Sequence, residues 1–396
     1  MINRAAPFRG RSRTRSPSGA APFNQLGRLL RGPSPWRPTY GRATRWLLVV
    51  LFGTISLMGA GCGVTTRETS SPSTPVTSTG PPTTSPTATT IPVQLPISEP
   101  GSAPVSVLFT IPVGEGGVTY EGGEPDWLLT GPAGFSVAAD VSVWIADTQG
   151  LRLLRVGADG SILVDVDTDA DEVGPLIDVV AHDGGVWGLE AVPVLDRYRL
   201  VSYSNTGNYL GAHTLPDGLH LENGLTGIEM GPNGDLWVEL EAGTMVYAAF
   251  DEGGRFSPRL LPGYQIDGLT LRPLATTERL ARFAIGEATL EIPIREQGSL
   301  TYEGTVPGAV AVLLSDVWLD DGVLAVDLTV LYVDLAGRVL ATATYPLPEV
   351  AANAYVPQDF ISVAPDGRLI AVVPRPDRID VVSLNLHEAA PEEDSR

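Results

Sequence analysis

The segment from Gly131 to Val166, GPAGFSVAADVSVWIADTQGLRLLRVGADGSILVDV, places the strongest constraint on the fold of this chain. It contains four short apolar runs separated by tight polar turns, which is the pattern of four antiparallel strands. Looser copies begin further along the sequence, at Ile177, Gly227 and Phe360. A four-stranded unit that recurs every ~40–50 residues is typical of a β-propeller, so the sequence predicts an all-β fold of this kind.

Alignment of the Asp-Gly and Asn-Gly turns gives the number of repeats. The equivalent inner-strand positions are Ser136, Asp178, Glu229, Val317 and Ser362. Their spacings are 42, 51, 88 and 45 residues, and the interval of 88 corresponds to two units, with a degenerate copy across 266–303. Six blades result, each of a length usual for a propeller, and seven blades are the alternative.

The last repeat contains only three strands, whereas one apolar run before the first repeat has no partner. This run is VSVLFTIPV at residues 105–113, and the chain ends in a polar tail at residues 389–396. A closed ring leaves no blade incomplete, so we expect the early run to be the fourth strand of the last blade. The predicted propeller therefore covers residues 105–388.

The best-defined repeat resembles known propeller families. The stretch GPAGFSVAADVSVWIADTQGLRLLRVGADGSI has a Pro-x-Gly inner strand, an aromatic strand that ends in Ala-Asp, an arginine-bearing strand and a glycine turn. In these features it is similar to an NHL-type repeat, and also to blades of streptogramin-lyase-like and gluconolactonase-like propellers. The resemblance implies the fold, but it does not imply one function, because propellers host unrelated activities.

A short apolar run near the N-terminus indicates export. Residues 1–45 are basic, residues 46–60 (WLLVVLFGTISLMGA) are apolar, and the only cysteine, Cys62, follows Gly61. This is the order of a secretory signal, and the run is shorter than the ~20 residues that span a bilayer. The segment resembles the lipobox of bacterial lipoproteins, which implies removal of residues 1–61 and diacylation of Cys62. An uncleaved N-terminal anchor and a cytosolic protein are the alternatives.

Composition indicates the surroundings of the propeller. Residues 62–104 are rich in Ser, Thr, Pro and Gly, which predicts a disordered linker between the lipid anchor and the first strand. Without residues 1–61, 16 Arg oppose 46 acidic residues, a formal charge of −30. Such a charge repels phosphate groups, so nucleic acid is excluded as a partner. We expect a monomer on the outer face of the cytoplasmic membrane, held there by its lipid.

Two acidic residues at equivalent inner-strand positions form the first candidate site. Asp178 and Glu229 stand where Ser136 and Ser362 stand in other repeats. Because inner strands line the axis of a propeller, the two carboxylates are expected to converge there, and buried charge needs a cation or a hydrogen-bond donor. We predict that they bind a divalent metal, such as Ca²⁺, or a polar ligand. Hydration by channel water, or pairing with an arginine, is the alternative.

A second candidate site follows from the gluconolactonase-like resemblance. Glu124, Asn223 and Asp267 stand in the local motifs GGEPDW, ENGL and IDGL. The resemblance implies the glutamate and the asparagine as metal ligands, and the aspartate as a ligand or a base that polarises water. The predicted function is a binding or scaffolding module for a protein, peptide or glycan. A metal-dependent hydrolase or lyase, with its site at the channel mouth, is the alternative.

Overall fold

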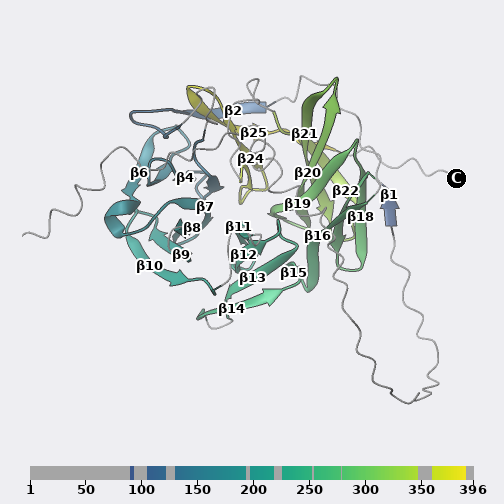
Figure 1. The fold of residues 1–396 in the computed structure, drawn as a ribbon, viewed down its shortest axis with the longest axis horizontal. Coiled ribbons are helices and arrows are strands. Elements are labelled where there is room, and N and C mark those ends of the chain that lie inside the picture. The colour runs from purple at the N-terminus through teal and green to yellow at the C-terminus, as the bar shows by residue number, and fades with distance from the viewer. Residues whose placement is uncertain are drawn as a thin grey trace, which may run out of the picture. The chain divides into compact units, whose positions relative to one another are not determined.

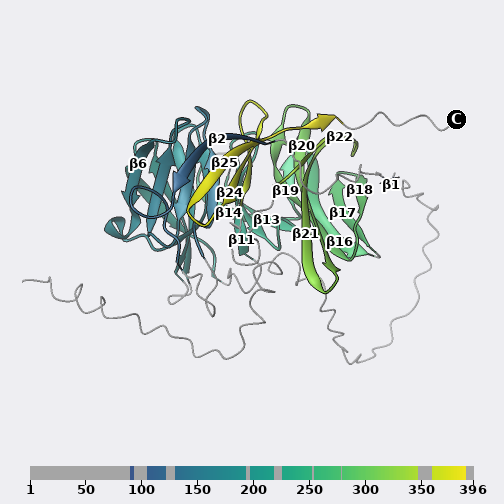
Figure 2. The same cartoon turned by 90° about the horizontal axis from the view of Figure 1, so that it is seen from above.

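Six β-sheets account for nearly all the regular structure of the chain (Figure 1). The computed structural model describes residues 90–92, 105–121, 130–192, 197–217, 225–251, 254–277, 279–346 and 359–388. The sheets are blades of four strands arranged in a ring, as two perpendicular views show (Figures 1 and 2). The predicted six-bladed propeller is therefore confirmed. Within the described residues, no helix is both long enough and apolar enough to cross a bilayer.

The first three blades are formed by strands that follow one another along the chain. Blade 1 contains β3 (Gly134–Val137), β4 (Val143–Asp147), β5 (Arg152–Val156) and β6 (Ile162–Asp167), which the 3₁₀-helix η3 (Thr168–Asp171) follows. Blade 2 contains β7 (Leu176–His182), β8 (Gly185–Val192), β9 (Arg197–Ser204) and β10 (Tyr209–Thr214). Blade 3 contains β11 (Leu225–Met230), β12 (Leu236–Leu240), β13 (Met245–Phe250) and β14 (Phe256–Leu261).

The other three blades repeat this order, with one strand taken from the start of the domain. Blade 4 contains β15 (Tyr264–Ile266), β16 (Leu269–Thr277), β17 (Leu280–Ile285) and β18 (Ala288–Pro293). Blade 5 contains β19 (Gln297–Val306), β20 (Ala309–Asp320), β21 (Val323–Asp334) and β22 (Val339–Thr344). Blade 6 contains β23 (Ile361–Val363), β24 (Leu369–Pro374), β25 (Arg378–Leu384) and, as its outer strand, β2 (Val105–Pro112).

Strand β2 closes the ring as the sequence predicts. It pairs antiparallel with β25, from Val105 opposite Leu384 to Pro112 opposite Arg378. The chain that follows β2 is then tied to blade 1, because the Thr119 amide donates to Asp147 Oδ1 at 2.9 Å. The chain therefore links the last blade to the first, because β2 pairs within blade 6 and the segment after it is hydrogen-bonded to blade 1.

Two short strands extend blades at their outer edges. Thr90–Pro92, within the predicted linker, form β1, which pairs parallel with β18 and makes blade 4 five-stranded. His387–Glu388 form β26, which pairs antiparallel with β22 of blade 5. The remaining residues of the predicted linker, the signal sequence with Cys62, and the tail 389–396 lie outside the described residues.

The blades pack face to face, so several of their inner and middle strands are buried on both sides, whereas the outer strands β6, β10 and β14 are partly exposed. All five residues of β4 are buried, and Trp144 and Trp237 on the second strands of blades 1 and 3 have exposed fractions of 0% and 1%. Trp237 packs against Tyr264 of the next blade with a centroid separation of 5.3 Å. Truncating such a side chain typically costs about 3–5 kcal/mol, so these tryptophans are core residues that hold neighbouring blades together.

The alignment of Val317 with the inner strands is wrong. Val317 lies on β20, the second strand of blade 5, and the inner strand of that blade is β19. Strands β20 and β21 have 12 residues each and are longer than their counterparts in the other blades. As a result, the Asp321-Gly322 turn that guided the alignment joins the second and third strands. The turn between the first two strands of this blade contains Gly308 instead.

Candidate functional site

Asp178 joins the inner strands of two blades. It lies on β7, with an exposed fraction of 3%, and its Oδ1 accepts a hydrogen bond from the Val179 amide at 2.7 Å. Its Oδ2 accepts a second bond, also of 2.7 Å, from the Ile228 amide on β11 of blade 3. Ser136 has a similar role in blade 1, since its Oγ accepts from the Ala181 amide of blade 2 at 2.9 Å. The carboxylate of Asp178 therefore has a structural role in addition to any binding role.

Two glycines allow the Asp178 carboxylate to fit between its neighbours. A Cβ atom at Gly134 of blade 1 would lie 2.5 Å from Asp178 Oδ1. A Cβ atom at Gly227 of blade 3 would lie 2.8 Å from Asp178 Oδ2 and 3.2 Å from Glu239 Oε2. Real Cβ atoms do not approach oxygen as closely as the first two distances, so these positions favour glycine. The carboxylates of Asp178 and Glu239 consequently border the same space beside Gly227.

Four further acidic residues interact electrostatically with Asp178 or with one another. Glu229 and Glu239 lie on β11 and β12 of blade 3, Glu303 lies on β19 of blade 5, and Asp359 precedes β23 of blade 6. The negative charges of these residues raise one another's pKa values, and each residue takes part in at least one such interaction. We call these five residues, Asp178, Glu229, Glu239, Glu303 and Asp359, the axial acidic cluster. Strands β7, β11 and β19, which carry three of these residues, lie toward the centre of the ring (Figure 1).

All five carboxyl groups of the axial acidic cluster bind their protons unusually tightly. Burial, and to a smaller extent neighbouring carboxylates, raise the pKa of Asp178 to about 8 and that of Glu303 to about 8. Burial also raises the pKa of Glu239 to about 7, although the Tyr264 hydroxyl donates a hydrogen bond to this carboxylate. The pKa values of Glu229 and Asp359 lie well above their ordinary range for the same reason. The cluster is therefore partly protonated near neutral pH unless a cation is bound.

Of the axial acidic cluster only Asp178 is fully buried by exposure, whereas the other four are half-buried, and arginine neutralises the four other fully buried acidic residues. The ion pairs are Asp147 with Arg152, Glu190 with Arg199, Asp316 with Arg295, and Asp380 with Arg375 and Arg378. Among the acidic residues that the described ranges show as fully buried, Asp178 alone has no arginine within ion-pair distance. A buried carboxylate without a cation is costly, so this exception marks the axis as a place where a cation would be stabilising.

The axial acidic cluster provides several carboxylate oxygens that can accept hydrogen bonds. In the described residues these oxygens are not close enough together to coordinate one metal ion. In the part of the chain that the structure describes, no three His, Cys, Asp or Glu side chains come close enough to hold one metal ion. The carboxylates come from blades 2, 3, 5 and 6, which spreads them over several strands. Such a spread suits an ammonium or guanidinium group, which takes several hydrogen bonds in different directions.

The structure brings together only part of the residues predicted from sequence. Asp178 and Glu229 both belong to the axial acidic cluster. Asp267 does not, because it lies in the exposed turn between β15 and β16, with a φ of 50°. Glu124 and Asn223 lie outside the described residues. The metal site implied by the gluconolactonase-like resemblance therefore stays a prediction.

Sequence reasoning missed Glu239, Glu303 and Asp359. Glu239 lies two residues after Trp237 on a second strand, where the corresponding residue of blade 1, Ala146, is apolar. Glu303 lies in the repeat whose inner strand was misaligned. Asp359 stands two residues before β23, the inner strand of blade 6, and an acidic residue so close to an inner strand was the one available signal.

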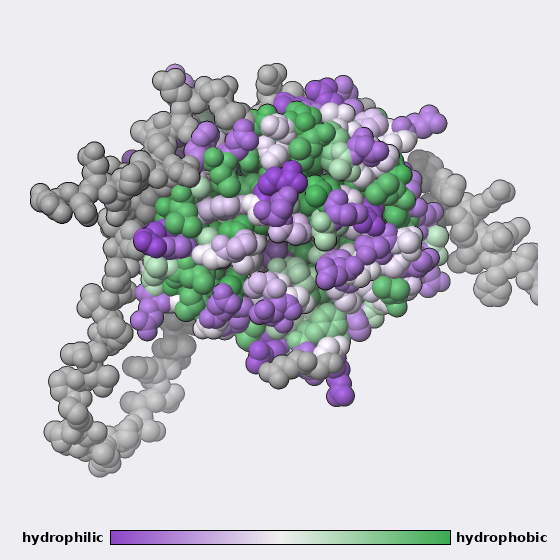
Figure 3. Space-filling view, turned by 180° about the vertical axis from the view of Figure 1, so that it is seen from behind, coloured by the Kyte–Doolittle hydropathy of each residue, from purple (hydrophilic) through white to green (hydrophobic). Residues whose placement is uncertain are grey.

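An aromatic cluster and scattered apolar side chains lie on the described surface of the propeller. Trp187 and His213 of blade 2 contact Phe250 and Phe256 of blade 3, and all four are half-buried. Large exposed apolar side chains such as Leu163, Leu210 and Leu260 lie on different blades. Hydrophilic and hydrophobic residues are interspersed on the face that Figure 3 shows. Among the described residues, the exposed apolar side chains are therefore scattered, and the axial acidic cluster is the better candidate site.

Comparisons with known proteins found similarity only among solved structures. No family model and no curated protein matches this sequence. A solved streptogramin B lyase is 14% identical over 64% of this chain and 94% of its own, with a TM-score of 0.39. Virginiamycin B lyase from Staphylococcus aureus is 15% identical over 65% and 96%, with a TM-score of 0.39. Aldose sugar dehydrogenase from Streptomyces coelicolor, in its PQQ-bound form, is 14% identical over 73% and 100%, with a TM-score of 0.40. With TM-scores this low, the similarities carry no argument about ligand or reaction.

Proposed function

We propose that this protein is a binding module of the bacterial cell envelope, and that its axial acidic cluster binds a cationic group of a peptide or protein partner. The observation that supports this proposal is the set of five carboxyl groups with raised pKa values. Elsewhere in the described residues, the fully buried carboxylates have arginine partners. The axial carboxylates would receive the equivalent partner from a ligand.

Electrostatics favour such a ligand over the alternatives. A bound cation reverses the effect of burial on the pKa of a carboxyl group, because it stabilises the ionised form. The excess of 46 acidic residues over 26 basic residues attracts cations and repels anions at long range. An anionic glycan or a nucleic acid would add charge to a group of carboxylates that is already too concentrated. A basic side chain would relieve that repulsion.

Calorimetric titration with acetyl-trilysine amide tests this function. We expect its affinity to rise about tenfold or more between about pH 6 and about pH 8.5, because a carboxyl group with a pKa of about 8 must ionise to bind a cation. Binding near neutral pH should also release protons, which two buffers of different ionisation enthalpy will reveal. The Glu303→Gln variant should bind at least about tenfold more weakly than the native protein.

The exposed residue Asp320, at the tip of blade 5, provides the matched control. Its Asp320→Asn variant removes one negative charge from the surface and should bind the peptide as the native protein does. If both variants bind equally, the peptide is attracted by the surface as a whole and the proposed site is wrong. Stoichiometric Ca²⁺ or Zn²⁺ retained by the purified protein would instead favour the alternative of a metal-dependent hydrolase or lyase.

The sequence supports a lipid anchor for this binding module. The apolar run at residues 46–60 and the cysteine that follows it have the order of a bacterial lipoprotein signal. Labelling of cells with a radioactive fatty acid should mark the native protein, and the Cys62→Ser variant should lose the label. Two acyl chains hold a protein stably on a membrane, so the variant should also appear in the soluble fraction. Equal labelling of both forms would contradict the proposed anchor.

A further inference from the structure

The outer edge of blade 4 is more regular than the outer edges of the other blades. Among the outer strands that the structure describes, β18 alone pairs with its neighbour without a register shift, from Ala288 to Pro293. In three of the other blades the residue left out of register is an exposed leucine: Leu163 of β6, Leu210 of β10 and Leu340 of β22. Such bulges discourage the addition of a strand, whereas a regular edge favours it.

Strand β1 covers this regular edge only in part. It pairs in parallel with Thr289, Leu290 and Glu291, which are half of the six residues of β18. Pro92, the last residue of β1, has no amide hydrogen to donate. Because one backbone hydrogen bond contributes about 0.5–1.5 kcal/mol net, a strand of three residues detaches easily. The edge of β18 is then open to any other strand that fits it.

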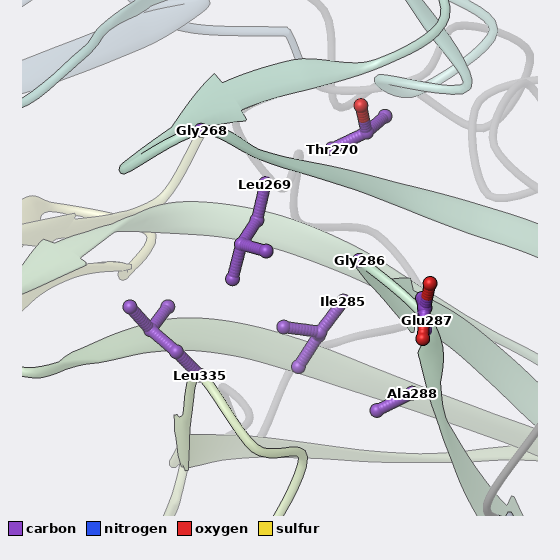
Figure 4. A pocket seen from close by; sticks show the side chains of 8 residues that line it. All are labelled: Gly268, Leu269, Thr270, Ile285, Gly286, Glu287, Ala288 and Leu335. Atoms are coloured by element: carbon purple, nitrogen blue, oxygen red, sulfur yellow. The ribbon is translucent and has the colours of Figure 1, made fainter.

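The beginning of β18 lies beside a shallow hollow of the surface. Ala288, the first residue of β18, lines this hollow together with Glu287 and with Leu335 of blade 5 (Figure 4). Glu287 is exposed, and Leu335 is half-buried. In a parallel pair both strands run in the same direction, so an added strand begins at this end of β18. The approach to the edge is therefore open to a strand from another molecule.

We propose that the outer edge of β18 accepts β1 of a second copy of this chain, in a reciprocal exchange of strands. The identical strand makes the same parallel pairing, from Thr90 opposite Thr289 to Pro92 opposite Glu291. Exchange therefore loses none of the hydrogen bonds that β1 makes within one chain. The residues of β1 carry no charge, so the transfer places no like charges opposite one another at the edge.

The position of β1 reduces the advantage of pairing within one chain. β1 lies on blade 4 and β2 on blade 6, so the shorter way around the ring passes blade 5 (Figure 1). The 12 residues 93–104 connect the two strands and reach at most about 43 Å. A tether that must stretch to its site gives a lower effective concentration than a slack one, so pairing between copies competes at millimolar concentration. This inference involves neither the axial acidic cluster nor its ligand, and it can fail while the proposed function holds.

Disulfide cross-linking between two single-cysteine chains tests the exchange. Both full chains carry Cys62→Ser, which removes the native thiol, and one carries Thr90→Cys while the other carries Thr289→Cys. The two positions lie opposite each other in the pairing of β1 with β18. Tags of different size identify the mixed disulfide on a non-reducing gel. We expect the fraction of mixed disulfide to be about tenfold or more higher at about 1 mM protein than at about 10 µM.

Leu163→Cys, in place of Thr289→Cys, is the matched control for random collision. Leu163 is exposed on the bulged outer strand of blade 1, and its mixed disulfide with Thr90→Cys should be about tenfold less abundant. Adding Ile91→Pro to the Thr90→Cys chain disfavours strand pairing and should lower the yield with Thr289→Cys to that of the control. Equal yields at Thr289→Cys and Leu163→Cys would overturn the proposal. A chain with both Thr90→Cys and Thr289→Cys that forms only the intramolecular disulfide at every concentration would overturn it as well.

Discussion

A chain that begins at residue 113 is expected to lose the cooperative thermal unfolding of the propeller. Such a chain lacks β2, which supplies the outer strand of blade 6. Phe109 and Ile111 on this strand are buried, with exposed fractions of 8% and 1%, and they pack in one cluster with Phe135 of blade 1. Removing each buried side chain costs about 2–5 kcal/mol, and β25 would also become an unpaired edge. The total approaches the whole stability of a typical domain, about 5–15 kcal/mol.

A chain that begins at residue 105 is the control for this truncation. It lacks β1 but keeps β2, so its calorimetric transition should remain single and sharp. A pair of substitutions within β2 gives the same comparison at full length. Ile111→Asp places a charge in the core, whereas Val107→Asp changes a side chain with an exposed fraction of 56%. If the chain from residue 113 melts like the chain from residue 105, the ring is held together without β2.

Closure could be predicted from the sequence because it depends on counting strands. In the sequence, the last repeat has one strand too few and the run at 105–113 has no partner. In the structure this run is β2, and it pairs with β25 as the missing strand of the last repeat. The internal order of blade 5 could not be predicted in this way. Its turn residues Asp321 and Gly322 are those of any tight turn, and only the length of β20 and β21 shows which strands they connect.

The candidate site was predicted in part for a similar reason. Asp178 and Glu229 stand at inner-strand positions of two well-formed repeats, so their position relative to the axis follows from the repeat. Glu239 could not be found in this way because it lies on a second strand. It reaches the same space only because Gly227 opposite it has no side chain. That contact is a property of strand pairing, which a single sequence does not reveal.

Replacement of Glu239 by glutamine is expected to stabilise the protein at about pH 9 and to have little effect at about pH 5. Burial raises the pKa of Glu239 from 4.5 to about 7, so the folded state holds this proton more tightly than the unfolded state. Protonated Glu239 therefore leaves the folded state at its full stability below about pH 4.5. This stability is lost as the pH rises through 7, because the carboxyl group then ionises in the folded protein. A shift of that size corresponds to about 3 kcal/mol. Glutamine keeps an oxygen for the Tyr264 hydroxyl and carries no charge at any pH.

The native protein should show the same trend, because burial also raises the pKa of Asp178 and Glu303 to about 8. Its free energy of unfolding, measured with urea, should fall between about pH 5 and about pH 8.5. Glu190→Gln is the matched comparison, because this buried carboxylate is paired with Arg199. Its loss leaves the arginine without its partner, and it should destabilise the protein by about 3–5 kcal/mol near neutral pH.

Opposite effects of Glu239→Gln and Glu190→Gln at about pH 9 would distinguish an unpaired from a paired buried carboxylate in one protein. If both substitutions destabilise the protein at this pH, Glu239 has a cationic partner that the described residues do not supply. Extensive dialysis at low pH, where the carboxyl groups are protonated, should then release that cation. The sign of the Glu239→Gln effect would change after its removal, because the remaining carboxylates would again repel one another.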